Sequence, residues 1–348
     1  MAVIAGEACR TVSEEDGVKL PVSAKYIPLL ATALVLLALY TLGCVSFDNF
    51  NSLRVLVNLV GDNAFLGVAA IGATFVILSG GIDLSVGSVV AFTSIFIASL
   101  VGHGVNPLAA IALALLAGAL FGTAMGSLIR AFQLPPFLVT LAGMFLVRGL
   151  GFIVHPQSLG ITHAFFLQRV TEGWAIPLNE RVSVPFTATC YAAFFLVALF
   201  VAHYTRFGRF IYALGGDEQS ATLMGLPVGP TKILIYTVSG FCSALAGVVY
   251  TFYTQSGDPA SCVGLELDAI ASVVIGGTLL SGGVGFMAGT MMGVLILGLI
   301  QTLITFKGDL NTWWTKIVVG MLVLAFILLQ NLISALSHRI KTRIPASG

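Results

Sequence analysis

The residues best suited to chemistry lie in a glycine-rich segment, residues 79–88 (SGGIDLSVGS), which interrupts two apolar stretches and contains one carboxylate, Asp83. A second glycine-rich break follows another apolar stretch at residues 281–285. Inside a membrane, irregular backbone is tolerated only where protein buries it or where it lines a water-filled cavity. Both breaks are therefore candidates for a hinge, a gate or part of a path through a membrane. The candidate residues are Gly80, Gly81, Asp83, Ser85, Gly87, Ser281, Gly282, Gly283 and Gly285.

Asp83 also has a possible structural role. A helix is expected to begin just after it, so its carboxylate can accept hydrogen bonds from free backbone N–H groups and face the positive end of the helix dipole. Ionisable groups this close to a membrane are costly and usually face protein or water. The two interpretations are compatible, and the sequence leaves both open.

Arg148 lies within an apolar stretch, LAGMFLVRG at residues 141–149, and therefore needs a partner or a route to water. Asp62, Glu266 and Asp268 are possible counter-ions. A structural ion pair and a place beside a substrate path both remain open for Arg148. Glu266 and Asp268 stand just before an expected helix, so helix capping is their alternative role.

No motif for catalysis or nucleotide hydrolysis is present. The sequence lacks a G-x-x-x-x-G-K-[ST] phosphate-binding loop, an H-E-x-x-H zinc motif and a G-x-S-x-G nucleophile motif. Its five cysteines include no C-x-x-C pair, and its net charge of +1 gives no reason to expect nucleic acid as a partner. We expect no enzymatic activity, no cofactor and no metal. Uphill transport would need energy from a partner or an ion gradient.

Composition determines which elements must hold these residues. Of 348 residues, 57% are hydrophobic and only 9% are charged, and the mean hydropathy is +1.01. A soluble domain carries about 25% charged residues because its surface faces water. Most of the surface of this chain must therefore face lipid. We predict an all-α, polytopic membrane protein with about ten transmembrane helices, some of them short or broken.

Uncharged stretches locate the expected helices. The stretch at residues 86–129 is too long for one crossing and divides at a turn near residues 102–107. Glycines divide the stretch at residues 269–306 into a short helix and a helix from about residue 284. The other helices are expected at residues 26–47, 63–82 with an amphipathic lead-in from residue 53, 135–154, 184–202, 231–254 and 316–336. Outside the membrane lie two loops, residues 155–183 and about 204–230, and two tails, residues 1–25 and 337–348.

The distribution of Lys and Arg predicts the orientation. With the N-terminus in the cytoplasm, ten basic residues fall inside and five outside, as the positive-inside rule favours. Both termini and the loop at residues 204–230 are then cytoplasmic. The loop at residues 155–183 is then periplasmic.

A short helix is predicted within the loop at residues 204–230. Gly215 and Gly216 precede residues 217–224, and Gly225 follows them. This stretch begins acidic and ends apolar, which suits the helix dipole. Leu223 and Met224 would then be exposed apolar residues, as in a helix that docks onto a partner. A solvated linker is the alternative.

Several of these segments together resemble a known family. They are DNAFLG at residues 62–67, GGIDLSVGS at 80–88, LAGMFLVRG at 141–149, ASVVIGGTLLSGGVG at 271–285 and the loop at 206–225. Over about residues 45–335, the chain resembles the permease subunits of bacterial ABC importers for monosaccharides such as ribose, xylose and galactose, which have the type II importer fold. DNAFLG and WWTKI at residues 313–317 make it most similar to a galactofuranose importer permease.

The resemblance implies an inner-membrane permease that imports a sugar. Family members pair as two permease subunits, like or unlike, receive sugar from a periplasmic binding protein, and dock a cytoplasmic ATPase through a short coupling helix. Carried over to this sequence, the coupling segment comprises Gly215, Gly216, Asp217, Ala221, Leu223, Met224 and Gly225.

Two rival functions are weighed against this one. An ion-coupled secondary sugar transporter needs titratable carboxylates within the membrane, and Asp83, Asp62 and Asp268 are few and close to helix ends. A polytopic membrane enzyme needs a catalytic cluster, which the sequence does not offer.

Overall fold

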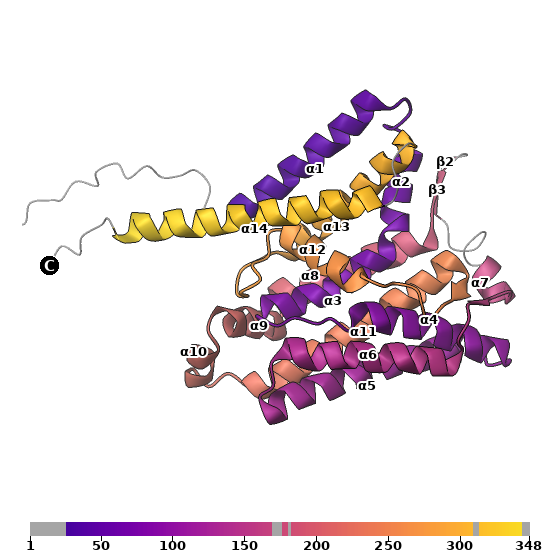
Figure 1. Cartoon of the computed structure of the whole chain (residues 1–348), viewed down its shortest axis with the longest axis horizontal. Coiled ribbons are helices and arrows are strands. Elements are labelled where there is room, and N and C mark those ends of the chain that lie inside the picture. The colour runs from indigo at the N-terminus through magenta and orange to yellow at the C-terminus, as the bar shows by residue number, and fades with distance from the viewer. Residues whose placement is uncertain (1–25, 169–175, 180–181, 309–312, 343–348) are drawn as a thin grey trace, which may run out of the picture.

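The computed structural model of the protein describes residues 26–168, 176–179, 182–308 and 313–342, and helices dominate this part of the chain (Figure 1). The helices are α1 (Ile27–Ser46), α2 (Leu53–Asp62), α3 (Ala64–Leu78), α4 (Val86–Gly102), α5 (Pro107–Phe132), α6 (Pro136–Val154), α7 (Ala164–Gln168), α8 (Phe186–Tyr204), α9 (Arg206–Gly216), α10 (Glu218–Leu223), α11 (Val228–Thr254), α12 (Leu265–Ile275), α13 (Met287–Lys307) and α14 (Trp313–Thr342). Two antiparallel strand pairs accompany them: β1 (Leu159–Gly160) with β4 (Ser256–Gly257), and β2 (Ile176–Asn179) with β3 (Val182–Val184).

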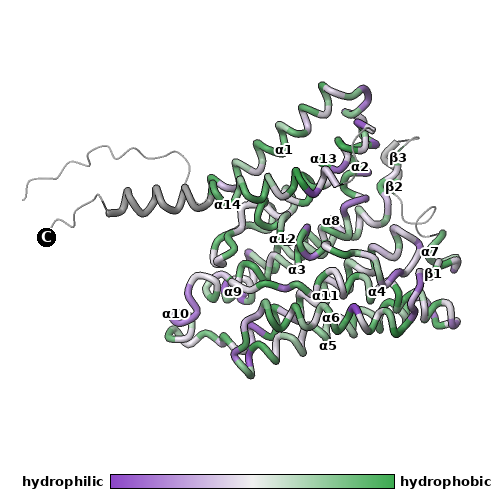
Figure 2. The backbone as a smooth tube through the Cα atoms, viewed as in Figure 1, coloured by the Kyte–Doolittle hydropathy of each residue, from purple (hydrophilic) through white to green (hydrophobic). Residues whose placement is uncertain are grey.

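Six of the described helices are long and apolar enough to cross a membrane, namely α1, α5, α6, α8, α11 and α13. The helices α2 and α3 are bent by 52° relative to each other and make a seventh crossing if the pair is counted as one span. Helix α4 and residues Trp313–Leu329 of α14 are shorter apolar helices, and α12 has 11 residues. Figure 2 shows apolar residues along most of the bundle. These ten segments support the predicted all-α polytopic fold with about ten crossings, some short or broken.

The helix expected at residues 63–82 is shorter than the sequence predicts. Helix α3 ends at Leu78, and residues 81–85 have no regular structure. Gly80 adopts a φ of +80°, a left-handed conformation that an α-helix cannot continue through. By contrast, the predicted division of residues 86–129 is confirmed. Asn106 caps α5 there, accepting a hydrogen bond of 2.9 Å from the Leu108 N–H.

Helix α11 forms the centre of the bundle and packs against α5, α3 and α4. Three glycines of α5 face it, Gly118, Gly122 and Gly126, spaced four residues apart and thus on one side of the helix. A Cβ atom on Gly122 would lie 2.1 Å from the carbonyl oxygen of Tyr236. Lipid gives no hydrophobic drive for helix association, so small residues that permit close backbone approach stabilise such pairs.

The bundle has two distinct ends (Figure 1). Helices α9 and α10 lie at one end, where α1 begins and α14 ends, and the β2–β3 hairpin lies at the other. Tyr26, just before α1, stacks on Phe286 with ring centroids 5.3 Å apart, and Phe286 lies against His203 near the end of α8. We call the end of the bundle with α9 and α10 the α10 end, and the end with the β2–β3 hairpin the hairpin end. The start of α1 and the end of α14 thus lie at the same end of the bundle as α9 and α10. Residues 1–25 and 343–348 of the two predicted tails lie outside the described residues, and the orientation in the membrane stays a prediction.

Candidate functional site

Three chain segments meet backbone to backbone near the α10 end. The N–H of Gly283 donates a hydrogen bond of 2.9 Å to the carbonyl oxygen of Leu78, so the break after α12 is bound to the end of α3. Gly215, near the end of α9, lies against both atoms. We call the five glycines at this meeting point the glycine junction, which consists of Gly80, Gly215, Gly216, Gly282 and Gly283.

Side chains are excluded from most of the glycine junction. A Cβ atom on Gly215 would lie 1.9 Å from the Leu78 carbonyl oxygen and 2.5 Å from the Gly283 nitrogen. A Cβ on Gly282 would lie 2.6 Å from the Gly80 nitrogen, and Gly282 also has a φ of +86°. Real Cβ atoms do not approach other atoms so closely. Glycine is therefore required by space at Gly215 and by both space and conformation at Gly282.

Further contacts bind α9 to the same two breaks. The hydroxyl of Tyr212 donates a hydrogen bond of 2.9 Å to the carbonyl oxygen of Gly285. The ring centroids of Phe207 and of Phe75 in α3 are 5.9 Å apart. Ser281 brings its carbonyl oxygen to within 3.3 Å of where a Cβ on Gly80 would lie. Helix α9 thus contacts the end of α3 and the α12–α13 connection at several points.

Helix α10 follows α9 directly and matches the short helix predicted within residues 217–224. Asp217 caps it, with its Oδ1 accepting a hydrogen bond from the Ser220 N–H, and hydrogen bonds from Ser220 lower the pKa of Asp217 below its usual value. Ala221 is buried, whereas the side chains of Leu223 and Met224 are 88% and 69% exposed. The helix therefore presents its apolar end away from the rest of the chain.

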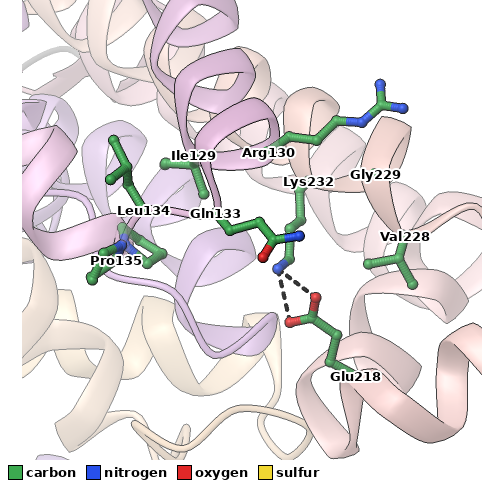
Figure 3. A pocket seen from close by; sticks show the side chains of 10 residues that line it. Ile129, Arg130, Gln133, Leu134, Pro135, Glu218, Val228, Gly229 and Lys232 are labelled. Atoms are coloured by element: carbon green, nitrogen blue, oxygen red, sulfur yellow. Dashed lines mark hydrogen bonds and ion pairs between the residues drawn. The ribbon is translucent and has the colours of Figure 1, made fainter.

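An ion pair connects α10 to the start of α11. The Nζ of Lys232 lies 2.6 Å and 2.8 Å from the two carboxylate oxygens of Glu218. The pair borders a pocket of about 510 Å³, and Figure 3 shows Arg130, from the end of α5, pointing away from the pair. Since both partners are partly exposed, the pair contributes little to stability. It is a contact between α10 and the first turns of α11.

Asp83 does not cap α4, which corrects the structural role considered for it. Its Oδ1 accepts hydrogen bonds from the N–H and the hydroxyl of Ser85, at 2.9 and 2.6 Å. Its Oδ2 accepts one of 2.7 Å from the buried hydroxyl of Ser239 in α11. Asp83 is itself buried. The carboxylate therefore joins the non-helical segment before α4 to the central helix.

The helices α4 and α12 begin next to each other inside the bundle. A Cβ on Gly87, in the first turn of α4, would lie 2.2 Å from Oε2 of Glu266, in the first turn of α12. The other oxygen of Glu266 accepts a hydrogen bond of 3.2 Å from the Gly264 N–H, the residue before α12, so its predicted capping role is partly met. Gly87 thus lies apart from the glycine junction. Gly81 also lies outside it, against the Tyr236 hydroxyl.

Arg148 has no carboxylate partner among the described residues, so the expected ion pair is wrong. Its Nη1 donates hydrogen bonds to the carbonyl oxygens of Pro259 and Ser261, at 2.9 and 2.6 Å. Asp268 instead pairs with Lys316 of α14, at 2.7 Å. Arg148 therefore holds the connection between β4 and α12 against α6, because carbonyl groups in that irregular backbone need donors.

Sequence reasoning missed three residues of this region. Each binds a residue from a segment that the sequence did single out. Tyr212 binds Gly285, 73 residues away, and Ser239 binds Asp83, 156 residues away. Lys232 binds Glu218, 14 residues away. Lys232 alone carried a local signal, because it is a basic residue next to the predicted short helix. Ser239 and Tyr212 lie in ordinary apolar or amphipathic stretches, where nothing in the local sequence marks them.

Comparisons with known proteins agree with this architecture. The family model described as branched-chain amino acid transport system / permease component matches residues 55–327. The chain is 49% identical to the inner membrane ABC transporter permease protein YjfF of Escherichia coli (strain K12), covering 88% of this chain and 92% of the relative. It is 38% identical to the fructose import permease protein FruG of Bifidobacterium longum, covering 89% and 92%, and 36% identical to the ribose import permease protein RbsC of Escherichia coli (strain K12), covering 86% and 92%. No solved structure gives a significant match.

Proposed function

Because the chain belongs to this family of ABC transporter permeases, we propose that it is the membrane-spanning subunit of an importer that carries a monosaccharide across a bacterial inner membrane. Relatives named for fructose and ribose import support a sugar as the substrate. Within that class, galactofuranose is our proposed substrate, on the strength of the DNAFLG and WWTKI segments.

The glycine junction is the observation that carries this proposal. Gly215 and Gly216 directly precede Asp217, the cap of α10, and they contact the breaks after α3 and α12. A displacement of α10 must therefore move the ends of α3 and α12, since close-packed backbone cannot absorb it. We propose that these two breaks form the gate or hinge of the transporter or line its translocation path; their residues are Gly80, Gly81, Asp83, Ser85, Gly87, Ser281, Gly282, Gly283 and Gly285.

A separate ATPase would supply the movement. Its proposed binding surface is α10, with Leu223 and Met224 as the apolar contacts and Asp217 as the cap that holds the helix. This assignment places the α10 end, and with it both chain termini, in the cytoplasm. A sugar-binding protein then delivers substrate at the hairpin end, and a second permease subunit, identical or related, completes the transporter.

Co-purification tests the coupling surface. Replacing Leu223 and Met224 by Asp should abolish recovery of an ATPase with the tagged chain from native membranes, because two charges replace the exposed apolar contacts. Thr222→Asp, within α10, is the matched variant that keeps both apolar residues. Full recovery of the ATPase with the Leu223 and Met224 variant would show that the coupling assignment is wrong.

Uptake measurements test the proposed energy source. The purified complex in proteoliposomes should import sugar only with ATP and the sugar-binding protein present. Sugar uptake by the chain alone, driven by a proton gradient, would favour the ion-coupled alternative instead.

A further inference from the structure

A polar pocket of about 520 Å³ lies toward the hairpin end of the bundle. Its walls come from α2, the start of α3, the end of α11, the start of α12 and the last turns of α13. This volume falls within the range of about 300–1,000 Å³ that is usual for small-molecule sites. None of the residues assigned above to the glycine junction or to α10 lines it.

Several polar residues of this pocket lie within or beside helices that are apolar enough to cross a membrane. Gln301 lies six residues before Lys307, the last residue of α13, which is about 9 Å from that end of the helix. Asn58 and Asp62 face the same pocket from α2, and all three side chains are exposed in this chain. Polar and ionisable groups within a hydrocarbon core of about 30 Å face protein or water. The pocket therefore opens to water or to another protein subunit.

The chemistry of the pocket suits a neutral, polyhydroxylated molecule. Among the described residues, no protein group hydrogen-bonds to the side-chain amides of Asn58 and Gln301, and each amide offers two donors and an acceptor. The rings of Phe65 and Tyr253, with centroids 6.0 Å apart, line the same space. An aromatic wall packs against the apolar face of a sugar ring while the amides bind its hydroxyl groups.

The charges around the pocket balance. Asp268, on the pocket wall, is paired with Lys316 at 2.7 Å. Arg54 and Asp62, of opposite sign, also line the pocket. Among the described residues, these three groups on the pocket wall and Lys316 behind Asp268 make two positive and two negative groups, which give no net attraction for an anion or a cation. A neutral ligand fits it better than an ion does.

Two walls of the pocket lead to the glycine junction. Helix α3 begins beside the pocket at Phe65 and ends at Leu78, whose carbonyl oxygen binds Gly283. Helix α12 begins beside the pocket at Leu265 and is followed by the break that holds Gly282. Thr74 of α3 and Thr290 of α13 are joined by a hydrogen bond of 2.8 Å between the two. A ligand in the pocket thus touches the same helices that the junction holds.

From this geometry we propose that the pocket between α2, α3, α11, α12 and α13 binds one monosaccharide on the hairpin side of the glycine junction, before the sugar crosses. The inference rests on the proposed sugar-import function and adds the binding site to it. Asn58 and Gln301 provide hydrogen bonds, and Phe65 and Tyr253 provide the stacking surface.

Uptake by the complete transporter tests this site. The tagged chain with its accompanying subunits is reconstituted in proteoliposomes, with the sugar-binding protein added. Initial uptake of labelled ribose, fructose and galactose, the last equilibrated with its furanose form, is measured at low concentration. Asn58→Leu and Gln301→Leu should each lower uptake of the transported sugar about tenfold, the effect of losing roughly one or two hydrogen bonds. Thr41→Leu, an exposed polar residue of α1 outside the pocket, is the control and should transport like wild type.

A labelling experiment provides a second readout that does not depend on the Leu variants. Gln301→Cys should react with a membrane-impermeant maleimide above the background of the unmodified chain, and the transported sugar should slow that reaction. Absence of labelling would show that another subunit covers the pocket, and labelling without protection would show that no sugar binds there. Either result overturns the inference.

The outcomes separate this inference from the proposed function. If the wild-type transporter imports none of the three sugars, the proposed function fails and the inference fails with it. If the wild type imports a sugar and both Leu variants match Thr41→Leu, the pocket assignment is wrong while the proposed function stands.

Discussion

Replacing Gly215 by Ala is the sharpest test of the glycine junction. The new Cβ would lie 1.9 Å from the Leu78 carbonyl oxygen, whereas ordinary van der Waals contact begins at 3.4 Å. Helix α9 and the end of α3 must therefore separate by about 1.5 Å, the difference between these distances. Overpacking of this kind costs about 1–3 kcal/mol. Weakening the Gly283–Leu78 hydrogen bond adds about 0.5–1.5 kcal/mol.

The neighbouring glycine provides a matched control. A Cβ on Gly216 would meet no atom within 4 Å, and neither Gly215 nor Gly216 has a positive φ. Alanine raises helix propensity by up to about 1 kcal/mol at either position. The difference between Gly215→Ala and Gly216→Ala therefore isolates the close contact with Leu78 and Gly283.

The assay is ATP-driven sugar uptake by the reconstituted complex, with ATPase co-purification measured in parallel. A cost of about 2 kcal/mol in one conformation shifts a two-state equilibrium roughly thirtyfold. We expect Gly215→Ala to lower uptake at least tenfold while the ATPase still binds, because α10 itself is unchanged. Gly216→Ala should keep both properties. Equal uptake by the two variants would refute the claim that the junction transmits movement from α10.

Three further predictions concern other contacts. Gly122→Ala should destabilise the bundle by about 1–3 kcal/mol, seen as a lower thermal midpoint in detergent, whereas Gly149→Ala, with open space around it, should not. Arg148→Met should destabilise by about 2–4 kcal/mol through the loss of two charged hydrogen bonds; a midpoint equal to that of wild type would contradict this role, and Arg148→Lys should recover part of the loss. Asp217→Ala should weaken ATPase recovery while Asp217→Asn keeps it, since Asn also caps helices. The pKa of Asp217 is lowered in the folded state, so its stabilisation of α10 is complete above the usual Asp pKa and is lost as the pH falls through the lowered pKa. Recovery of the ATPase with the wild-type chain should therefore decline at acidic pH, whereas recovery with the Asn variant should not.

Local patterns in the sequence were sufficient for the class of protein and for most helix boundaries. Apolar stretches of about 20 residues located the crossings because the hydrocarbon thickness dictates their length. Asp217 and the flanking glycines located α10 because capping acts within one turn. The glycine-rich segments around Gly80 and Gly282 indicated that helices break there, although the end of α3 was predicted four residues too late.

The partners of the buried polar groups were decided only by the tertiary structure. Arg148 was expected to meet a carboxylate but binds the carbonyl oxygens of Pro259 and Ser261, 111 and 113 residues away. Capping of the following helix was one of two roles considered for Asp83, but its carboxylate instead binds Ser85 and, 156 residues away, Ser239 in α11. Local sequence cannot encode such choices, because any of several groups could satisfy the same charge or donor.

Hydropathy and glycine content thus determined that the chain spans a membrane and where its helices break. They did not determine that Gly215 would pack on Leu78 and Gly283, since that contact joins segments 137 and 68 residues apart. Such contacts form only when helices with suitable small residues are brought side by side, and the packing of the whole bundle decides which ones meet.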